Sequence, residues 1–182
     1  MPASENPVRK KHAGPANIAI RQFGEEDWSG TWSIIEPVLR AGDSYSFPTD
    51  MTAQQARDIW IRQPQATYVA TDDAGRILGT YFLKANQPGQ GAHVCNCGYI
   101  VAETARGRGV ASAMCEHSQA EAIRMGFRAM QYNLVVATNE GAVRLWKKHG
   151  FDIVGSLPGA FRHPSAGYVD AYVMYKQLVV PA

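Results

Sequence analysis

The stretch that decides the fold reads GYIVAETARGRGVA over residues 98–111. It begins as a strand, and a helix is expected from Gly109 to Met125. Glycines before a helix let backbone N–H groups approach a ligand closely. The start of a helix adds unpaired N–H donors and the positive end of the helix dipole. This order of strand, glycine turn and helix predicts a binding site for a phosphate group.

Two common phosphate-binding fingerprints do not fit this turn. The Gly-x-Gly-x-x-Gly fingerprint of dinucleotide-binding proteins would need glycine in place of Ser112. The P-loop needs Gly-Lys followed by Ser or Thr, which the chain lacks. A glycine pair by itself is most often only a tight turn, so the prediction depends on the rest of the chain.

Strands and helices follow one another in the order of an α+β domain. Strands are predicted over 17–23, 66–71, 76–84, 93–101, 129–136, 151–154 and 168–175. Helices are predicted over 25–39, 52–62, 109–125 and 139–149, and a loop over 155–167. Hairpins followed by strand–helix units predict one mixed, mostly antiparallel sheet of about seven strands with about four flanking helices.

Length, composition and charge narrow the class of protein. The 182 residues suffice for one domain, expected over 16–182 after a flexible tail at 1–15. A net charge of +2 is too small for a nucleic-acid-binding surface. We expect no membrane association and no secretory leader, because no suitable apolar run is present. An odd number of cysteines, Cys95, Cys97 and Cys115, fits a reducing cytoplasm.

The glycine turn and a later segment together resemble the GNAT acetyltransferase superfamily. Residues 106–111 match its Arg/Gln-x-x-Gly-x-Gly/Ala turn, and residues 139–151 are similar to its Asn-x-x-Ala-x-x-x-Tyr-x-x-x-Gly-Phe element. The resemblance covers residues 17–178. It implies a single GNAT-like domain and an acyltransferase activity that uses acetyl-CoA as co-substrate, without a metal.

The resemblance also implies which residues hold acetyl-CoA. The glycine turn would bind the pyrophosphate, Asn139 would lie beside the pantetheine arm, and Trp146 stands where the family has tyrosine. The strand before the turn can pair with the pantetheine through its backbone, and one of its N–H groups can stabilise the oxyanion. The expected binding residues are Tyr99, Ile100, Val101, Arg106, Gly107, Arg108, Gly109, Val110, Ala111, Asn139 and Trp146.

A narrower resemblance concerns the acceptor. Segments 77–86, 93–99, 132–135 and 169–171 are similar to a fungal group of N-acetyltransferases that acetylate proline analogues such as azetidine-2-carboxylate. The resemblance implies that Asn96 and Asn133 place the substrate carboxylate and polarise the reacting carbonyl. It implies a small-molecule amine as partner, in particular an amino acid or an analogue. A homodimer is compatible with the sequence.

Two departures from the family pattern concern proton transfer. Many members carry Glu on the strand before the turn, but residues 93–101 contain no carboxylate. Water held by Asn96 or Asn133 is the preferred route for the amine proton. Trp146 cannot protonate the departing thiolate, which leaves Tyr132 or Tyr99 as the donor. The titratable alternatives to water, in order of preference, are His93, Asp170 and Asp43.

Other interpretations compete with the small-molecule enzyme. A CoA-binding regulatory module would bind acetyl-CoA without turnover. A protein N-acetyltransferase would need an open groove, which long loops at 41–50 and 155–167 would tend to close. His93, Cys95 and Cys97 alternate like metal ligands, but a fourth ligand at matching spacing is absent. Further candidates for the acceptor pocket are Tyr45, Phe47, Arg162 and His163.

Overall fold

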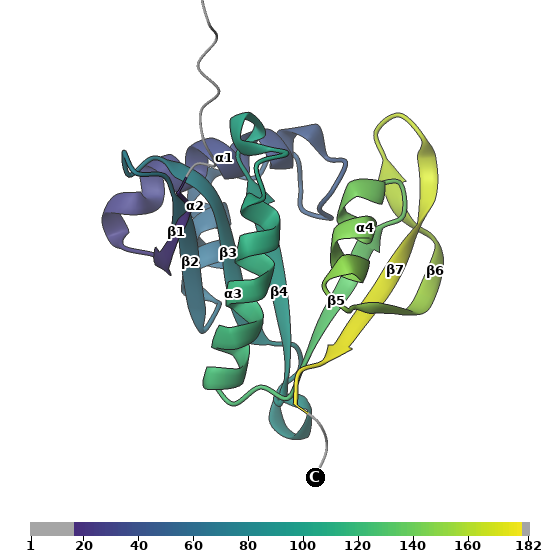
Figure 1. Cartoon of the computed structure of the whole chain (residues 1–182). Coiled ribbons are helices and arrows are strands. Elements are labelled where there is room, and N and C mark those ends of the chain that lie inside the picture. Colours follow the sequence, from purple (N-terminus) through teal and green to yellow (C-terminus); the bar gives the residue numbers. More distant parts are fainter. Residues whose placement is uncertain (1–16, 180–182) are drawn as a thin grey trace, which may run out of the picture.

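The computed structural model describes residues 17–179, so the tail expected at 1–15 lies outside the described residues. Within this part, seven strands form one sheet in the order β1-β2-β3-β4-β5-β7-β6 (Figure 1). Neighbouring strands are antiparallel except for the parallel pair β4 and β5. This confirms the predicted α+β fold. The strands are β1 (Ala19–Gln22), β2 (Ala66–Thr71), β3 (Ile77–Ala85), β4 (Val94–Val101), β5 (Ala129–Val136), β6 (Asp152–His163) and β7 (Gly167–Gln177).

Four α-helices flank the sheet in the described residues. Figure 1 shows α3 in front of β3 and β4, with α1 and α2 on the other side of the sheet. The buried residues Ile34, Ile35 and Leu39 of α1 recur at helical spacing, as expected for a helix with one apolar face. No described helix is long and apolar enough to cross a membrane. The helices are α1 (Trp28–Ala41), α2 (Ala53–Arg57), α3 (Val110–Arg124) and α4 (Glu140–Lys148).

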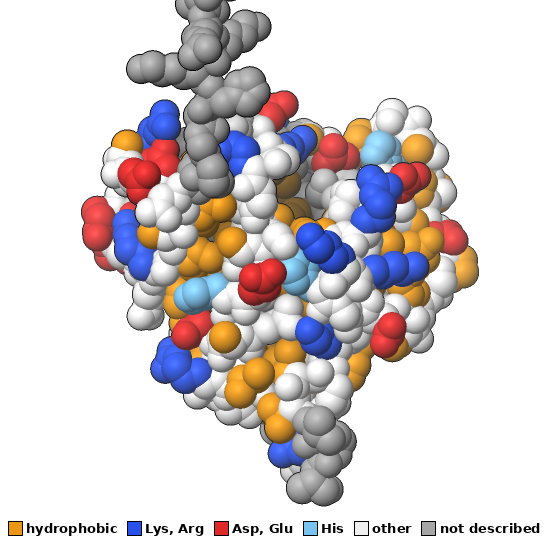
Figure 2. Space-filling model, viewed as in Figure 1, with side chains coloured by type: hydrophobic (Ala, Val, Ile, Leu, Met, Phe, Trp, Pro, Cys, Tyr) orange, Lys and Arg blue, Asp and Glu red, His pale blue; other side chains and the backbone are white. Residues whose placement is uncertain are grey.

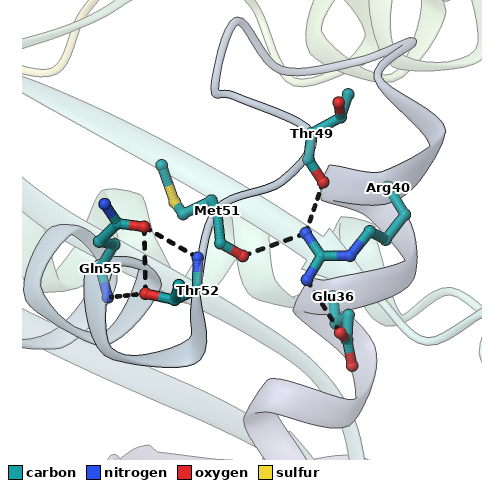
Figure 3. A network of polar contacts seen from close by, with 6 residues as sticks. All are labelled: Glu36, Arg40, Thr49, Met51, Thr52 and Gln55. Carbon is teal, nitrogen blue, oxygen red and sulfur yellow. Dashed lines mark hydrogen bonds and ion pairs between the residues drawn. The ribbon is translucent and has the colours of Figure 1, made fainter.

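The loop between α1 and α2 is anchored close to α2 (Figure 3). The Arg40 guanidinium donates hydrogen bonds to the carbonyls of Thr49 and Met51, the latter at 3.0 Å. Thr52 and Gln55 form a reciprocal capping box in which the Gln55 Oε1 accepts the Thr52 N–H at 2.9 Å. The chain therefore leaves α1 and enters α2 at fixed points, which determines where the intervening loop can lie.

β4 and β5 are paired over a short distance only. Val94 lies opposite Ala129 and Cys95 lies opposite Met130, and no further residue pair joins these strands in the described structure. Beyond these pairs the two strands diverge, as Figure 1 shows. One edge of β4 is consequently left without a partner strand along most of its length, directly before the glycine turn.

The prediction of a loop over 155–167 was wrong for residues 155–163, which belong to β6. β6 continues to His163 and pairs with β7 along a hairpin that turns at residues 164–166. The pairing contains two irregularities, and Gly159, with φ of 58°, donates its N–H to the Asp170 carboxylate at 2.9 Å. An exposed strand with glycine-containing bulges lacks the apolar alternation of a half-buried strand, and its composition therefore indicated a loop.

Candidate functional site

A cavity of about 980 Å³ lies where β4 and β5 diverge. This volume is at the upper end of the range of small-molecule sites, roughly 300–1,000 Å³. Ile100 and Arg108 do not line it. The other residues expected to bind acetyl-CoA line it, together with Asn96, Tyr132 and Asn133: Tyr99, Val101, Arg106, Gly107, Gly109, Val110, Ala111, Asn139 and Trp146.

The glycine turn has the geometry of an anion site. Gly107 and Gly109 have φ values of 72° and 82°, in the left-handed region that other residues rarely adopt. A Cβ at either position would meet no heavy atom within 4 Å, so the backbone borders open space. α3 begins directly after Gly109, and the N–H groups of its first turn have no carbonyl partners within the helix. The turn therefore fits a phosphate.

Positive side chains lie at the same end of the cavity. Arg106 and Lys148 line it, and neither pairs with a carboxylate within the described residues. Figure 2 shows Lys and Arg side chains gathered over α4, beside the hollow. Unpaired cations near a helix N-terminus suit a polyanion, so this end of the cavity fits the pyrophosphate of acetyl-CoA.

The open edge of β4 presents backbone groups to the cavity. The Val94 carbonyl accepts the N–H of Asn86, directly after β3, at 2.9 Å, and the Ala102 N–H donates to the Leu78 carbonyl of β3 at 2.8 Å. Because hydrogen-bonding direction alternates along a strand, the N–H groups of Tyr99 and Val101 point away from β3, to the open edge. The Ile100 N–H points to β3, and its side chain is 3% exposed in the core. Of the three expected backbone donors, Ile100 is therefore unavailable.

Tyr45 occupies the open edge of β4. Its hydroxyl accepts the Tyr99 N–H at 2.8 Å and donates to the Tyr99 carbonyl at 2.8 Å. The ring lies against Phe47 and Trp60, with centroid distances of 5.7 Å to each. Burial raises the pKa of Tyr45, so this hydroxyl is protonated at neutral pH. The sequence placed Tyr45 near the acceptor pocket without indicating this contact.

Aromatic side chains from β4, β5 and α4 form one wall of the cavity. Trp146 lies 4.8 Å from Tyr99 and 4.9 Å from Tyr132, measured between ring centroids. The Tyr132 hydroxyl is 3.1 Å from the Tyr99 hydroxyl, which in turn is 2.7 Å from the Ser118 hydroxyl. Burial raises the pKa of Tyr132 and of Tyr99 well above its ordinary value, so both remain protonated.

The opposite end of the cavity is lined by amides. The Asn96 amide donates to the Gln131 carbonyl at 2.9 Å, just past the last paired residues of β4 and β5. The Asn133 Oδ1 accepts from the Gln131 side chain at 2.9 Å, and its Nδ2 donates to the Asn86 Oδ1 at 2.7 Å. Asn133 lies in a β-bulge of β5, where the register with β7 shifts. Bulges redirect side chains, and the residue in this bulge, Asn133, lines the cavity.

The structure separates the candidate bases. Asp43 lines the cavity, whereas His93 and Asp170 do not. His163 also lines the cavity, and Arg162 does not. The His163 Nδ1 accepts backbone N–H groups at 3.3 and 3.2 Å, which places the proton of the neutral ring on Nε2. His163 is therefore suited to donate a hydrogen bond rather than to remove a proton.

Two cavity features escaped the sequence analysis. Lys84 lines the cavity beside Asn96, but only the pairing of β3 with β4 brings these residues together. Ser112, on the first turn of α3, lines the cavity and has its hydroxyl 2.6 Å from the His149 Nε2. His149 follows α4, thirty-seven residues later, so no local pattern could have indicated this contact.

The three cysteines are buried thiols. Cys97 lines the cavity, but burial raises the pKa of its thiol well above the ordinary value, which leaves little reactive thiolate. Burial also raises the pKa of Cys95, to about 12. His93 is exposed and is hydrogen-bonded to the Gln90 carbonyl at 3.0 Å. Within the described residues, no group of three His, Cys, Asp or Glu side chains is arranged to hold a metal ion.

Comparisons with known proteins agree with this geometry. The sequence model of the acetyltransferase (GNAT) family matches residues 28–151. N-acetyltransferase aca1 of Schizosaccharomyces pombe is 29% identical over 165 residues, which are 82% of this chain and 79% of that protein. A solved GCN5-related N-acetyltransferase from Kribbella flavida is 40% identical with a TM-score of 0.84, over 88% of this chain and 97% of that one.

A third relative was solved with its cofactor. The structure of yncA, a putative acetyltransferase from Salmonella typhimurium with acetyl-CoA, covers 92% of this chain and 97% of its own, with a TM-score of 0.77 and 18% identity. At this identity the likeness concerns the fold. The family match and the Kribbella flavida relative carry the assignment further: the chain belongs to the acetyltransferase (GNAT) family, as an N-acetyltransferase that uses acetyl-CoA.

Proposed function

We propose that this N-acetyltransferase moves the acetyl group from acetyl-CoA directly to the amine of a small molecule, an amino acid or an amino-acid analogue. The observation that carries the proposal is the amide-lined end of the cavity, where Asn96 and Asn133 lie away from the phosphate-binding turn. Both asparagines belong to the segments similar to fungal enzymes that act on proline analogues. The proposed catalytic domain comprises residues 16–182.

The residues at the other end of the cavity would hold acetyl-CoA, which supplies a thioester as the acetyl donor. Backbone N–H groups of the glycine turn, with Arg106, bind the pyrophosphate. Asn139 caps α4 by accepting the Ala142 N–H at 3.1 Å through its Oδ1, which leaves its amide N–H groups available to the pantetheine arm. The open edge of β4 pairs with the pantetheine as an added strand would.

The Tyr99 N–H is the proposed donor to the reacting carbonyl oxygen. It lies on the open edge of β4, and a fixed backbone N–H can stabilise charge that develops on that oxygen. The Tyr45 hydroxyl now holds this N–H at 2.8 Å. Tyr45 must therefore release Tyr99 before catalysis, and the loop between α1 and α2 is the segment that moves.

Proton transfer completes the reaction. The neutral amine forms a bond to the acetyl carbon, the carbon–sulfur bond breaks, and one amine proton leaves. We propose that water held by Asn96 or Asn133 receives this proton, with Asp43 as the carboxylate that lines the same cavity. Tyr132 is the proposed donor to the departing thiolate, since its hydroxyl is protonated at neutral pH. Direct transfer is favoured because the Cys97 thiol is held protonated by burial.

Thiol release tests the proposal. The enzyme and acetyl-CoA are incubated with proline, azetidine-2-carboxylate, other amino acids, and peptides with a free N-terminus or lysine. We expect release with free amino acids or analogues. Release with peptides alone would favour a protein N-acetyltransferase, and acetyl-CoA binding without release would favour a regulatory module. Either outcome would refute the proposed acceptor class.

A further inference from the structure

Ser112 and His149 form a hydrogen-bonded pair at the phosphate-binding end of the cavity, and the mechanism above leaves this pair without a role. The Ser112 Oγ lies 2.6 Å from the His149 Nε2. Ser112 belongs to the first turn of α3 and lines the cavity, whereas His149, the C-cap of α4, does not line it. The His149 side chain is only 8% exposed. His149 therefore lies behind Ser112, where it can act on a bound ligand through the serine hydroxyl.

The protonation of the imidazole decides where the Ser112 hydroxyl points. A serine hydroxyl has one proton to donate, and a neutral imidazole has one N–H and one acceptor nitrogen. The Glu116 Oε1 lies 3.9 Å from the His149 Nδ1, and this carboxylate favours the neutral form that carries its proton on Nδ1. The Nε2 then accepts the Ser112 proton. In this form the hydroxyl turns only lone pairs to the cavity, and it cannot donate to a phosphate oxygen.

A second proton on His149 reverses this hydrogen bond. Once Nε2 is protonated, its N–H donates to the Ser112 Oγ, and the serine proton is free to turn into the cavity. The hydroxyl then joins the N–H groups of the first turn of α3 as a donor to a phosphate oxygen. The added proton comes from solvent, and no covalent bond between heavier atoms forms or breaks.

The groups that face His149 make its charge sensitive to a bound anion. Burial, with the ammonium groups of Lys148 in α4 and Lys176 in β7, lowers the pKa of His149. The Lys176 Nζ donates to the His149 carbonyl at 2.7 Å. Glu116 of α3 and the C-terminal end of the α4 dipole act in the opposite direction. A pyrophosphate beside Ser112 adds negative charge, which favours the protonated ring.

We infer that acetyl-CoA binding carries a proton from solvent onto His149, and that this proton turns the Ser112 hydroxyl to the pyrophosphate. Ser112 is a cofactor-binding residue, and His149 is the positioning residue that sets the direction of its hydroxyl. The affinity for acetyl-CoA therefore increases as pH falls through neutrality. The inference rests on the proposed place of the pyrophosphate at the glycine turn. It goes beyond that proposal, because backbone N–H groups alone would bind the pyrophosphate without taking up a proton.

Calorimetric titration with acetyl-CoA counts this proton directly. Titrations near neutral pH are run in two buffers that differ in their heat of ionisation, and the difference in observed heat gives the number of protons taken up. Kd is also measured from about pH 6 to about pH 8, the range in which histidine titrates. The 3′-phosphate of acetyl-CoA titrates in this range as well, but its contribution is common to the wild type and every variant.

Four variants separate the pair from the rest of the site. His149→Gln cannot titrate, Ser112→Ala removes the hydroxyl, and Ser112→Thr keeps it. His117→Gln is the matched control, because the His117 Nδ1 is also 2.6 Å from a hydroxyl, that of Tyr81, on the same helix but outside the cavity. Melting temperature without ligand verifies that each variant is folded.

The wild type and His117→Gln should take up more protons than His149→Gln. Their Kd should rise about three- to tenfold from pH 6 to pH 8 beyond the change in His149→Gln, because the complex binds the proton more tightly than the free protein. Ser112→Ala should weaken binding about three- to tenfold at pH 6, as expected for a lost hydrogen bond to a charged group, and much less at pH 8. Ser112→Thr should recover the affinity at pH 6.

Equal proton uptake in the wild type and His149→Gln would overturn the inference. An affinity loss in Ser112→Ala that is the same at pH 6 and pH 8 would overturn it as well, since the hydroxyl would then bind independently of the proton. A wild type that binds no acetyl-CoA would instead refute the proposed place of the pyrophosphate.

Discussion

The two ends of the cavity are built in different ways. The backbone of the phosphate-binding end comes from one continuous segment, in which β4 is followed by Gly107, Gly109 and the start of α3. The acceptor end is assembled from β3, β4 and β5, with Lys84, Asn96 and Asn133 brought together by strand pairing and a bulge. A local structure can be recognised from sequence spacing, whereas an assembled one requires the register of the sheet.

The largest effect is expected at the continuous end. Gly109→Glu places a side chain at φ of 82° and a negative charge against the pyrophosphate, so Kd for acetyl-CoA should rise roughly a hundredfold or more. Calorimetric titration measures the affinity. Gly75→Glu is the matched control, because Gly75 has φ of 76° and equally open space but lies outside the cavity. An affinity loss in both variants, or in neither, would contradict the assignment of the turn.

Two charge changes test whether the ends are independent. Asn133→Asp adds a negative charge beside the carboxylate of the proposed amino-acid acceptor, so KM for the amino acid should rise about tenfold while acetyl-CoA affinity stays constant. Asn139→Asp should do the reverse, weakening acetyl-CoA and sparing the acceptor. Since Asp caps helices as well as Asn does, the melting temperature of Asn139→Asp should equal that of the wild type. Steady-state kinetics, with the amino acid and acetyl-CoA varied separately, distinguishes the effect on the acceptor from the effect on acetyl-CoA. Effects that spread to both substrates would show that the ends are coupled.

Tyr45 contacts β4 between the two ends of the cavity, and removal of its hydroxyl should strengthen acetyl-CoA binding. Tyr45→Phe frees the Tyr99 N–H and carbonyl, so Kd for acetyl-CoA should fall roughly two- to tenfold, while the free enzyme loses about 1 kcal/mol of stability. Tyr68→Phe is the control, because its hydroxyl bonds Glu121 at 2.7 Å outside the cavity. Unchanged or weaker acetyl-CoA binding in Tyr45→Phe would indicate that Tyr45 stays on β4 during catalysis.

The smallest effect concerns His149, beside the phosphate-binding end. Burial lowers its pKa, so the folded protein binds this proton at a lower pH than the unfolded chain, which takes it up near pH 6.5. Its contribution to stability is therefore complete above that pH and is lost as pH falls. His149→Gln should lose less free energy of unfolding than the wild type between pH 7.5 and 5, measured by urea denaturation. Parallel losses in the two proteins would contradict this role.

The features that could be predicted from the sequence are those built from one continuous segment, and the features that could not are those assembled from distant segments. The strand, glycine turn and helix at 98–125 were predicted together with their ligand, because their signals are local. Residues 155–163, the greater part of β6, were mistaken for a loop, because pairing with β7 compensates for their irregular composition. The Ser112–His149 contact and the place of Lys84 depend on residues far apart in the chain. Tyr45 reaches the open edge of β4 from the loop between α1 and α2, and only tertiary packing determines where that loop lies.

The most direct test of the central claim is the melting temperature of the wild type with and without acetyl-CoA. A ligand that binds only the folded state at a hundred times its Kd stabilises a protein by about 2.7 kcal/mol. For a domain of this size that predicts a rise of roughly 5–10 °C, and the rise should disappear in Gly109→Glu. An unchanged melting temperature in the wild type at saturating acetyl-CoA would contradict the assignment of the cavity and its glycine turn.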